Sequence, residues 1–389
     1  MDHDERARAL HEALRGKISI TPKRTIESRD DLSFVYTPGV GCISRDIAKD
    51  VTLANVYTTK GSMVAIVSDG SAVLGLGDIG PTAALPVMEG KSVLFKRFAD
   101  VDAVPLCLDV HTADQLIAHI RALEPTFGGI NLEDIKAPIC FEVERALQDI
   151  GIPVFHDDQH GTAIVAYAGL LNALKVMNRL DQPQRIVING AGAAGHAIAT
   201  MIAEHAGKDA DAIRVENIIV CDSRGALYKG RESMTVYKNE LAEITNIDTI
   251  SGSLGEVIRD ATIFIGVSVG GMLTTDMVQT MSSEPIIFAL ANPDPEIMPD
   301  EAHAGRAGIV ATGRSDFPNQ VNNVVAFPGI FKAAFTYGYK QITDDMKYCA
   351  ALGLARLIDE PTPTNILPDI FEHDTAAAIV DALDPKSLH

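Results

Sequence analysis

The sequence predicts an α/β protein with an N-terminal α/β domain over residues 1–160, followed by a domain over residues 161–389 built on a doubly wound parallel sheet. Two observations support this fold class. Short apolar runs that resemble strands alternate with helical segments along most of the chain, which is typical of parallel sheets. In the second half, one strand-like run leads directly into a glycine-rich turn and a helix, which is the pattern of a βαβ unit.

The first half alternates strands and helices up to a polar cluster. The expected elements are a strand over 63–67, a helix opening over 91–98, a strand over 103–108, a helix over 112–122 and a strand over 152–155. The helix over 112–122 is supported by Leu116, Ile117 and Ile120, which fall on one helical face. The last strand ends in the polar run His156–His160.

The second half begins with an apolar helix and continues as repeated strand–helix units. The expected elements are helices over 162–177 and 196–206, and strands over 185–189, 217–222, 261–267, 286–291 and 308–311. The tail beyond residue 340 is expected to be helical and to serve packing only. No Pro/Gly/Ser-rich linker separates the two halves, so the boundary near residue 160 is placed where the pattern changes.

The run Gly190-Ala-Gly-Ala-Ala-Gly195 has the spacing of a dinucleotide-binding turn. Gly190 allows the tight turn, Gly192 lets the backbone approach a pyrophosphate, and Gly195 lets the helix pack closely on the strand. Ala193 and Ala194 lie at the helix start, whose free N–H groups attract phosphates. A glycine-rich turn without a ligand is the plain alternative. We therefore predict a Rossmann-type domain that binds a nicotinamide dinucleotide.

An acidic residue at the end of the next strand bears on which dinucleotide binds. Asp222 is expected to accept hydrogen bonds from the adenosine ribose hydroxyls of NAD. Arg224, two residues later, could instead receive the 2′-phosphate of NADP. The sequence therefore favours NAD and leaves NADP possible.

Composition and charge exclude several classes of partner. The chain has 33 basic and 52 acidic residues, a formal net charge of −19, which repels nucleic-acid phosphates and anionic lipid. The N-terminus has no apolar signal segment, and Asn172 and Lys175 interrupt the most apolar helix. The five scattered cysteines form no CxxC pair and are expected to be buried free thiols. We expect a cytoplasmic protein without nucleic-acid or membrane partners.

Two pairs of adjacent acids stand in strand-end or loop positions: Glu133-Asp134 and Asp157-Asp158. Adjacent acids most often mark only a solvated surface. The second pair, however, directly follows an apolar strand and precedes a helix. One interpretation is that Glu133, Asp134 and Asp158 converge on a hard cation, Mg²⁺ or Mn²⁺, with positions left open for a substrate.

Other polar residues occupy positions suited to a ligand site. Tyr36 lies in a Tyr-Thr-Pro-Gly-Val turn that can hold a phenol rigidly. Lys91 would by default be a solvated lysine at a helix start. Asn292, Asn322 and Asn323 lie at predicted strand ends, where open α/β sheets bind ligands. Their amides could bind a carboxylate or a ketone, although a half-buried tyrosine and loop asparagines are also ordinary features.

Together these motifs resemble the malic enzymes, specifically the short bacterial and archaeal form. The similar segments follow the family order over residues 15–340. They are Tyr36–Val40, Leu74-Gly-Leu-Gly-Asp-Ile-Gly80, Val87-Met-Glu-Gly-Lys91, Asn131-Leu-Glu-Asp134, Phe155–Thr162, Gly190–Gly195, Ala291-Asn-Pro293, and Asn322-Asn323 through Phe327-Pro-Gly329.

The resemblance implies oxidative decarboxylation of L-malate to pyruvate and CO₂ with NAD or NADP and a divalent metal. By motif, Glu133, Asp134 and Asp158 correspond to the metal ligands, Lys91 to the general base, Tyr36 to the general acid, Asp157 to the acid that interacts with the lysine, and Asn292 and Asn323, with the adjacent Asn322, to substrate contacts. Asn292 would also lie beside the coenzyme. A homodimer is expected from the same resemblance, and Tyr36 could serve its own site or its neighbour's.

One position departs from the family pattern. Longer members carry an arginine before the Leu-Gly-Leu-Gly motif that binds a substrate carboxylate, and this chain has Ala72 there. The carboxylate must therefore be captured by another residue.

Three other functions remain compatible with the sequence. A metal-independent 2-hydroxy-acid dehydrogenase would leave the three acids of the cation cluster without a role. A malolactic-type enzyme would retain the coenzyme and release lactate. A non-catalytic NAD-sensing module would need neither an acid nor a base.

Overall fold

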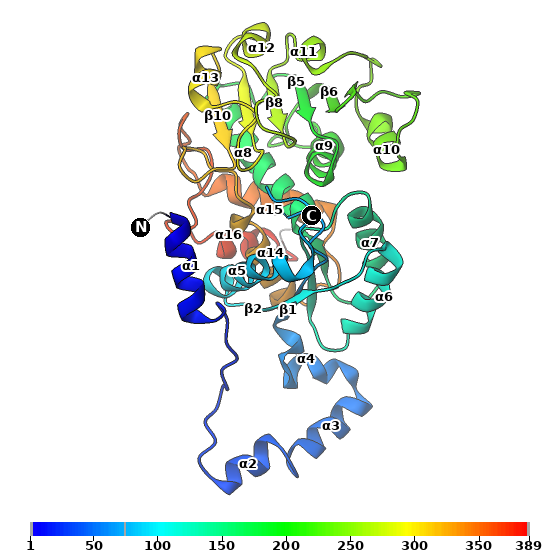
Figure 1. Ribbon diagram of the computed structural model, residues 1–389, viewed down its shortest axis with the longest axis vertical. Coiled ribbons are helices and arrows are strands. Elements are labelled where there is room, and N and C mark those ends of the chain that lie inside the picture. Colours follow the sequence, from blue (N-terminus) through cyan, green and yellow to red (C-terminus); the bar gives the residue numbers. More distant parts are fainter. Residues whose placement is uncertain (1–2, 74, 387–389) are drawn as a thin grey trace.

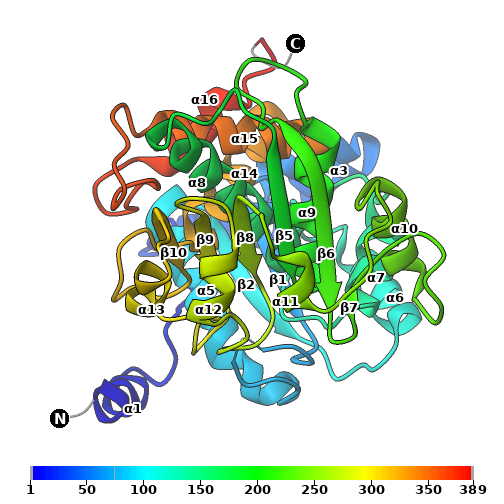
Figure 2. The same cartoon turned by 90° about the horizontal axis from the view of Figure 1, so that it is seen from above.

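The computed structural model describes residues 3–73 and 75–386, and its core consists of two β-sheets joined by a long buried helix (Figure 1). The first sheet has four strands and the second has six. Helices cover both faces of each sheet, as Figure 2 shows for the second one. The predicted class, an N-terminal α/β part followed by a Rossmann-like part, is confirmed.

The first sheet is entirely parallel, in the order β2-β1-β3-β4. Its strands are β1 (Met63–Ser68), β2 (Asp102–Cys107), β3 (Gly129–Leu132) and β4 (Val154–His156). Along β1, Val64 and Ile66 pack toward one face, and Ala65 and Val67 pack toward the other. Strand β3 was not predicted, because its four residues include the polar Asn131 and are too few to show a pattern.

Helix α5 (Pro81–Ala99) covers one face of the first sheet, and α6 (Ala113–Leu123) and α7 (Ile139–Leu147) cover the other. The prediction that Lys91 stands at a helix start is wrong, since α5 begins ten residues earlier. Pro86 and Gly90 disfavour a helix locally. Met88 and Phe95 are completely buried, however, and this burial outweighs the local cost.

The second sheet has the order β10-β9-β8-β5-β6-β7 and is parallel except for its last strand. Its strands are β5 (Gln184–Asn189), β6 (Val215–Asp222), β7 (Gly225–Ala226), β8 (Ile263–Gly266), β9 (Ile286–Ala289) and β10 (Ile309–Thr312). Helix α9 (Ala193–His205) covers one face, α11 (Leu254–Val257), α12 (Thr275–Thr280) and α13 (Pro299–Ala304) cover the other, and α10 (Val236–Ile244) contacts α9. The five longer strands lie where the sequence predicted them.

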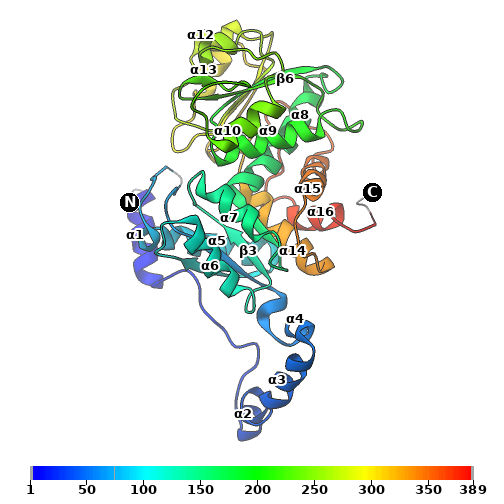
Figure 3. The same cartoon turned by 90° about the vertical axis from the view of Figure 1, so that its right-hand side faces the viewer.

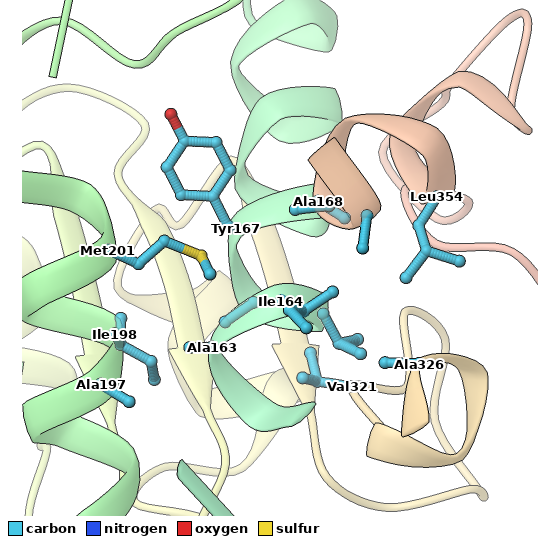
Figure 4. Close-up of a cluster of buried hydrophobic side chains, with 14 of the residues drawn as sticks. Ala163, Ile164, Tyr167, Ala168, Ala197, Ile198, Met201, Val321, Ala326 and Leu354 are labelled. Carbon is cyan, nitrogen blue, oxygen red and sulfur yellow. The ribbon is translucent and has the colours of Figure 1, made fainter. Parts of the chain in front are cut away.

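One buried helix, α8 (Thr162–Val176), lies between the two sheets and packs on α9 and on α15 (Asp344–Arg356). Figure 4 shows Ile164 and Tyr167 of α8 among Met201 and Leu354, which come from α9 and α15. The C-terminal helices are α14 (Phe327–Tyr337), α15 (Asp344–Arg356) and α16 (Thr375–Ala382), which confirms a helical tail. The ring of Phe327 in α14 lies 4.7 Å from that of Phe95 in α5, so α14 contacts the helix that covers the first sheet.

The N-terminal segment projects from this body as an arm of short helices (Figures 1 and 3). We use the term arm for residues 20–58, which contain α2 (Arg29–Val35), α3 (Val40–Lys49), η1 (Val51–Leu53) and α4 (Ala54–Tyr57). The arm follows α1 (His3–Leu14) and leads through η2 (Thr59–Gly61) into β1. None of these four arm helices buries a residue, although Phe34, Val51 and Val56 are apolar and about 70% exposed.

The structure also bears on the expectations about membrane-spanning helices and about the cysteines. In the described part of the chain, no helix has the length and apolar character needed to cross a membrane. All five cysteines have free thiols, and Cys140 and Cys221 are buried. Cys107 and Cys349 are only partly buried and Cys42 is exposed on α3, so the expectation of general burial is wrong for these three residues.

Candidate active site

The carboxyl ends of β3 and β4 bring the predicted metal-binding acids together. Glu133 and Asp134 directly follow β3, and Asp158 lies in the short π-helical segment η3 (Asp157–Gly161) after β4. One carboxylate oxygen from each of the three lies within 4.8 Å of the others. Asp134 also donates its backbone N–H to Asp158 Oδ2 at 2.8 Å and has a left-handed backbone (φ 54°), which non-glycine residues rarely adopt outside functional or turn positions.

This cluster fits a hard divalent cation. All three donors are carboxylates, the ligands that Mg²⁺ and Mn²⁺ prefer. Burial raises the pKa of Glu133 and of Asp158 because their negative charges are removed from water. A bound cation would offset that cost, so Glu133, Asp134 and Asp158 are the residues that could hold it.

Lys91 lies beside the cluster in the middle of α5 and is 8% exposed. Its Nζ donates to Glu133 Oε1 at 2.7 Å and to Asp157 Oδ2, and lies 4.3 Å from the centre of the Phe327 ring. Burial alone lowers its pKa, but the charges of Asp157, Glu133 and Asp158 outweigh burial and raise it. The structure thus contradicts the plain expectation of a solvated lysine.

Asp157 is the most enclosed acid of the site, with no exposed surface. Burial raises its pKa well above the usual range, against the opposing charge of Lys91. Space for its carboxylate depends on Gly161, because a Cβ there would lie 1.8 Å from Asp157 Oδ1. Lys91 and Asp157 therefore form a buried pair in direct contact, as the resemblance implied.

Two further residues, Asn131 and Glu144, support the acidic residues and η3 from neighbouring elements. No role was predicted for either from the sequence. Asn131 of β3 donates Nδ2–H to Glu133 Oε2 at 2.9 Å. Glu144 of α7 accepts from Gln159 at 3.0 Å and contacts His160 Nε2 at 2.7 Å, which ties η3 to α7. Asn131 occurs in a quoted motif, but nothing local shows that Glu144 faces η3.

A cavity of about 460 Å³ opens beside these groups. It is lined by the apolar Val87, Val93 and Leu94, and by Lys17, Gly90, Lys91, Glu133, Asp134, Asp158 and Asn323. Asn323, a predicted substrate contact, therefore lies at the site. Its neighbour Asn322 instead caps the short helix η4 (Asn323–Val325), where its Oδ1 accepts the N–H of Val324 at 3.0 Å.

The glycine turn lies at the carboxyl end of β5 and leads into α9. A Cβ at Gly195 would lie 1.8 Å from the carbonyl oxygen of Gly190, so only glycine permits this packing. A Cβ at Gly192 would meet nothing within 4 Å, which leaves open space over the N-terminus of α9 where Ala193 and Ala194 begin the helix. The turn therefore fits a diphosphate.

Asp222 ends β6, as predicted, but its carboxylate is already engaged. Oδ1 accepts from Arg231 at 2.6 Å and from the Arg224 N–H at 2.9 Å, and Oδ2 accepts from Lys238 at 2.6 Å. Burial opposes ionisation, but the bonds from Lys238 and Arg231 prevail and lower the pKa of Asp222 to about 2. The Arg224 guanidinium donates to the Ser233 carbonyl at 2.8 Å and does not contact Asp222.

Two of the predicted site residues, Asn292 and Tyr36, do not line the cavity beside Lys91. Asn292 follows β9. It lies close to the loop that joins β1 to α5, since a Cβ at Gly75 in that loop would be 3.5 Å from the Asn292 carbonyl oxygen. Leu74, in the same loop, lies outside the described residues. Tyr36 lies on the arm, directly after α2, is 67% exposed and does not line the cavity.

Comparison with known proteins agrees with this geometry. Residues 15–148 match the family profile "Malic enzyme, N-terminal domain" and residues 159–383 match "Malic enzyme, NAD binding domain". The chain is 51% identical to the bifunctional malic/malolactic enzyme of Bacillus subtilis, over 99% of this chain and 93% of that protein. It is 48% identical to the NAD-dependent malic enzyme of Geobacillus stearothermophilus, over 95% and 76%. Relatives described as NADP-dependent malic enzymes include one from Escherichia coli, 46% identical over 88% of this chain and 44% of that protein.

Solved structures show the same similarity. The NAD-dependent malic enzyme of Thermotoga maritima superimposes with a TM-score of 0.91 at 44% identity, covering 98% of this chain and 99% of that one. The malic enzyme of Pyrococcus horikoshii gives 0.89 at 40% identity, covering 97% and 90%. The chain therefore belongs to the malic enzyme family, whose reaction is the oxidative decarboxylation of malate with NAD or NADP.

Proposed function

We propose that this protein oxidises L-malate at the cavity beside Lys91, with Mg²⁺ or Mn²⁺ held by Glu133, Asp134 and Asp158. The observation that carries the proposal is the buried Lys91, which bonds both to Glu133 of the cation cluster and to Asp157. A simple hydroxy-acid dehydrogenase needs no such cluster. A sensor of NAD would need neither a buried lysine nor its partner acid.

The Lys91–Asp157 pair provides a route for the substrate's hydroxyl proton. Lys91 Nζ donates a hydrogen bond to Asp157, so this carboxylate is placed to hold the proton that Lys91 must release before it can act as a base. The neutral amine then accepts the hydroxyl proton, and a coenzyme held at the Gly190–Gly195 turn would supply the hydride acceptor. A divalent cation in the cluster would act as a Lewis acid that stabilises the charge left when CO₂ departs. Lys91 later returns its proton as pyruvate forms.

The proposed reaction is tested by following coenzyme reduction with L-malate and Mn²⁺, with and without a chelator, while pyruvate and lactate are quantified. We expect metal-dependent reduction with one pyruvate per reduced coenzyme. Reduction that survives chelation would contradict the proposal. Lactate without net reduction would instead favour the malolactic reaction, for which the printed name of the Bacillus subtilis relative is the supporting observation.

We propose further that the protein is a homodimer in which Tyr36 reaches the cavity of the partner subunit. The arm that carries Tyr36 buries none of its residues, and exposed Val87 and Val93 of α5 extend an apolar surface from the cavity. An apolar arm and an apolar surface of this kind are typical of an interface. In the partner's cavity, the phenol would protonate C3 of the enolate.

Mixing two inactive variants tests this arrangement. In a 1:1 mixture of Tyr36→Phe and Lys91→Met chains, half the dimers are mixed, and each mixed dimer has one intact site if Tyr36 acts across the interface. We therefore expect about a quarter of wild-type activity after the subunits exchange. If the mixture is no more active than either variant alone, Tyr36 does not act across the interface. Light scattering measures independently whether the protein is a dimer.

The surroundings of Asp222 support the use of both coenzymes. Asp222 can still bind the ribose hydroxyls of NAD, since a carboxylate oxygen accepts more than one hydrogen bond. Lys238 and Arg231 lie on the same carboxylate and could turn toward the 2′-phosphate of NADP. We propose that NAD is used and that these two cations also admit NADP.

A further inference from the structure

The substrate of the proposed reaction is a dicarboxylate, and the cavity offers little free positive charge to hold it. Lys91 is occupied by Glu133 and Asp157. Ala72 lies next to the cation cluster, where its N–H donates to the Asp134 carbonyl at 2.9 Å, but it carries no charge. The remaining cation among the described residues that line the cavity is Lys17.

Lys17 belongs to the segment between α1 and the arm, and two contacts fasten this segment to α5. Its backbone N–H donates to Glu89 Oε2 at 3.0 Å, and its Nζ donates to the Pro86 carbonyl oxygen at 2.5 Å. The half-buried Lys17 is therefore held over the helix that carries Lys91.

The Lys17 ammonium group retains capacity for a ligand. In the described part of the chain, no carboxylate oxygen lies within 4.0 Å of Nζ. An ammonium group has three N–H donors, and the Pro86 carbonyl uses one of them. A Cβ at position 90 would lie only 3.4 Å from Nζ, so Gly90 leaves room for the ammonium group at the cavity that Lys91 also lines.

We propose that Lys17 binds a carboxylate of the substrate. This inference rests on the proposed function. The carboxylate concerned is the one retained in pyruvate, because a cation paired with the departing carboxylate would oppose its loss as neutral CO₂. Lys17 thereby supplies the anion capture that Ala72 cannot provide in a protein of strongly negative net charge.

The test compares Lys17→Met and Lys17→Arg with Lys96→Met, a control lysine in the last turn of α5 whose partners are Asp100 and Asp102. Initial rates are measured with varied L-malate at saturating coenzyme and Mn²⁺. For Lys17→Met we expect the KM for malate to rise about tenfold or more, with kcat changed far less. Lys17→Arg should recover most of the affinity, and Lys96→Met should match the wild type.

Further readouts separate substrate binding from a merely structural role. The Mn²⁺ affinity, the KM for the coenzyme and the Tm of Lys17→Met should stay near wild type, and product inhibition by pyruvate should weaken in parallel with malate binding. A malate KM within twofold of wild type would overturn the proposal. Unchanged pyruvate inhibition would overturn the assignment to the retained carboxylate. If the wild type itself fails to oxidise malate, the proposed function has failed instead.

Discussion

Lys91 and Tyr36, the two side chains proposed for acid–base chemistry, are held in very different ways. Lys91 is 8% exposed, lies inside a 19-residue helix and contacts two buried acids. Tyr36 is 67% exposed and follows a helix that buries nothing. A single chain therefore places Lys91 and the three clustered acids by its own folding, whereas the surroundings of Tyr36 depend on what the arm contacts.

The largest effect is expected from removing the base. Lys91→Met should lower kcat by about a thousandfold or more, because no other described group is placed to shuttle the hydroxyl proton. It should also destabilise the fold by several kcal/mol, on the order expected for a broken buried ion pair. Steady-state kinetics and urea unfolding measure the two effects. Retention of more than a tenth of the activity would disprove the assignment.

Disrupting the arm should strongly reduce activity without disturbing Lys91 and its partner acids. Paired Leu32→Asp and Phe34→Asp substitutions on α2 should dissociate the dimer and reduce kcat about a hundredfold or more, since a general acid typically contributes that much. Light scattering and Mn²⁺ binding should show monomers that still bind the cation. Asp30→Ala on the same helix serves as the control. A monomer that retains activity would contradict the view that Tyr36 depends on the contacts of the arm.

The cation cluster should respond to mutation and to pH in a defined direction. Asp158→Asn should weaken Mn²⁺ binding by about tenfold or more. Because burial raises the pKa of Glu133 and of Asp158, protons compete with the cation, so Mn²⁺ affinity should fall as the pH is lowered. Calorimetric titrations at several pH values measure this, with Asp114→Asn on α6 as the control. A pH-independent affinity would contradict the raised pKa values.

Coenzyme choice should show a smaller effect. Lys238→Ala should lower kcat/KM for NADP about tenfold and leave that for NAD nearly unchanged, because only the 2′-phosphate needs the charge. Asp222→Ala should act in the opposite direction by removing the ribose acceptor. Equal effects of either variant on both coenzymes would refute the proposed division of roles.

The smallest effect should distinguish two adjacent asparagines. Asn322→Ala removes the cap of η4 and should cost about 1 kcal/mol of stability with little change in kinetics. Asn323→Ala, in the cavity, should raise the KM for malate and leave the Tm nearly unchanged. If Asn322→Ala had the larger kinetic effect, the assignment of Asn323 to substrate binding would be wrong.

Much of the second domain followed from local sequence. Its five longer strands are short β-branched runs, and the glycine turn between β5 and α9 has a spacing that its function requires. The first domain was harder to predict. Strand β3 was too short to show a pattern, and Pro86 and Gly90 concealed half of α5. Burial against the sheet determined these elements, and burial is not a local property.

The sequence by itself therefore determined the fold class and the coenzyme turn, because strand periodicity and glycine geometry are written in neighbouring positions, and it offered Glu133, Asp134 and Asp158 as one interpretation that the family resemblance favoured. Only the tertiary structure decided which groups meet. It placed Lys91 between Glu133 and Asp157, enclosed Asp222 between Arg231 and Lys238, brought Lys17 to the cavity, and separated Tyr36 from it. Such encounters join residues far apart in the chain and depend on the packing of whole elements.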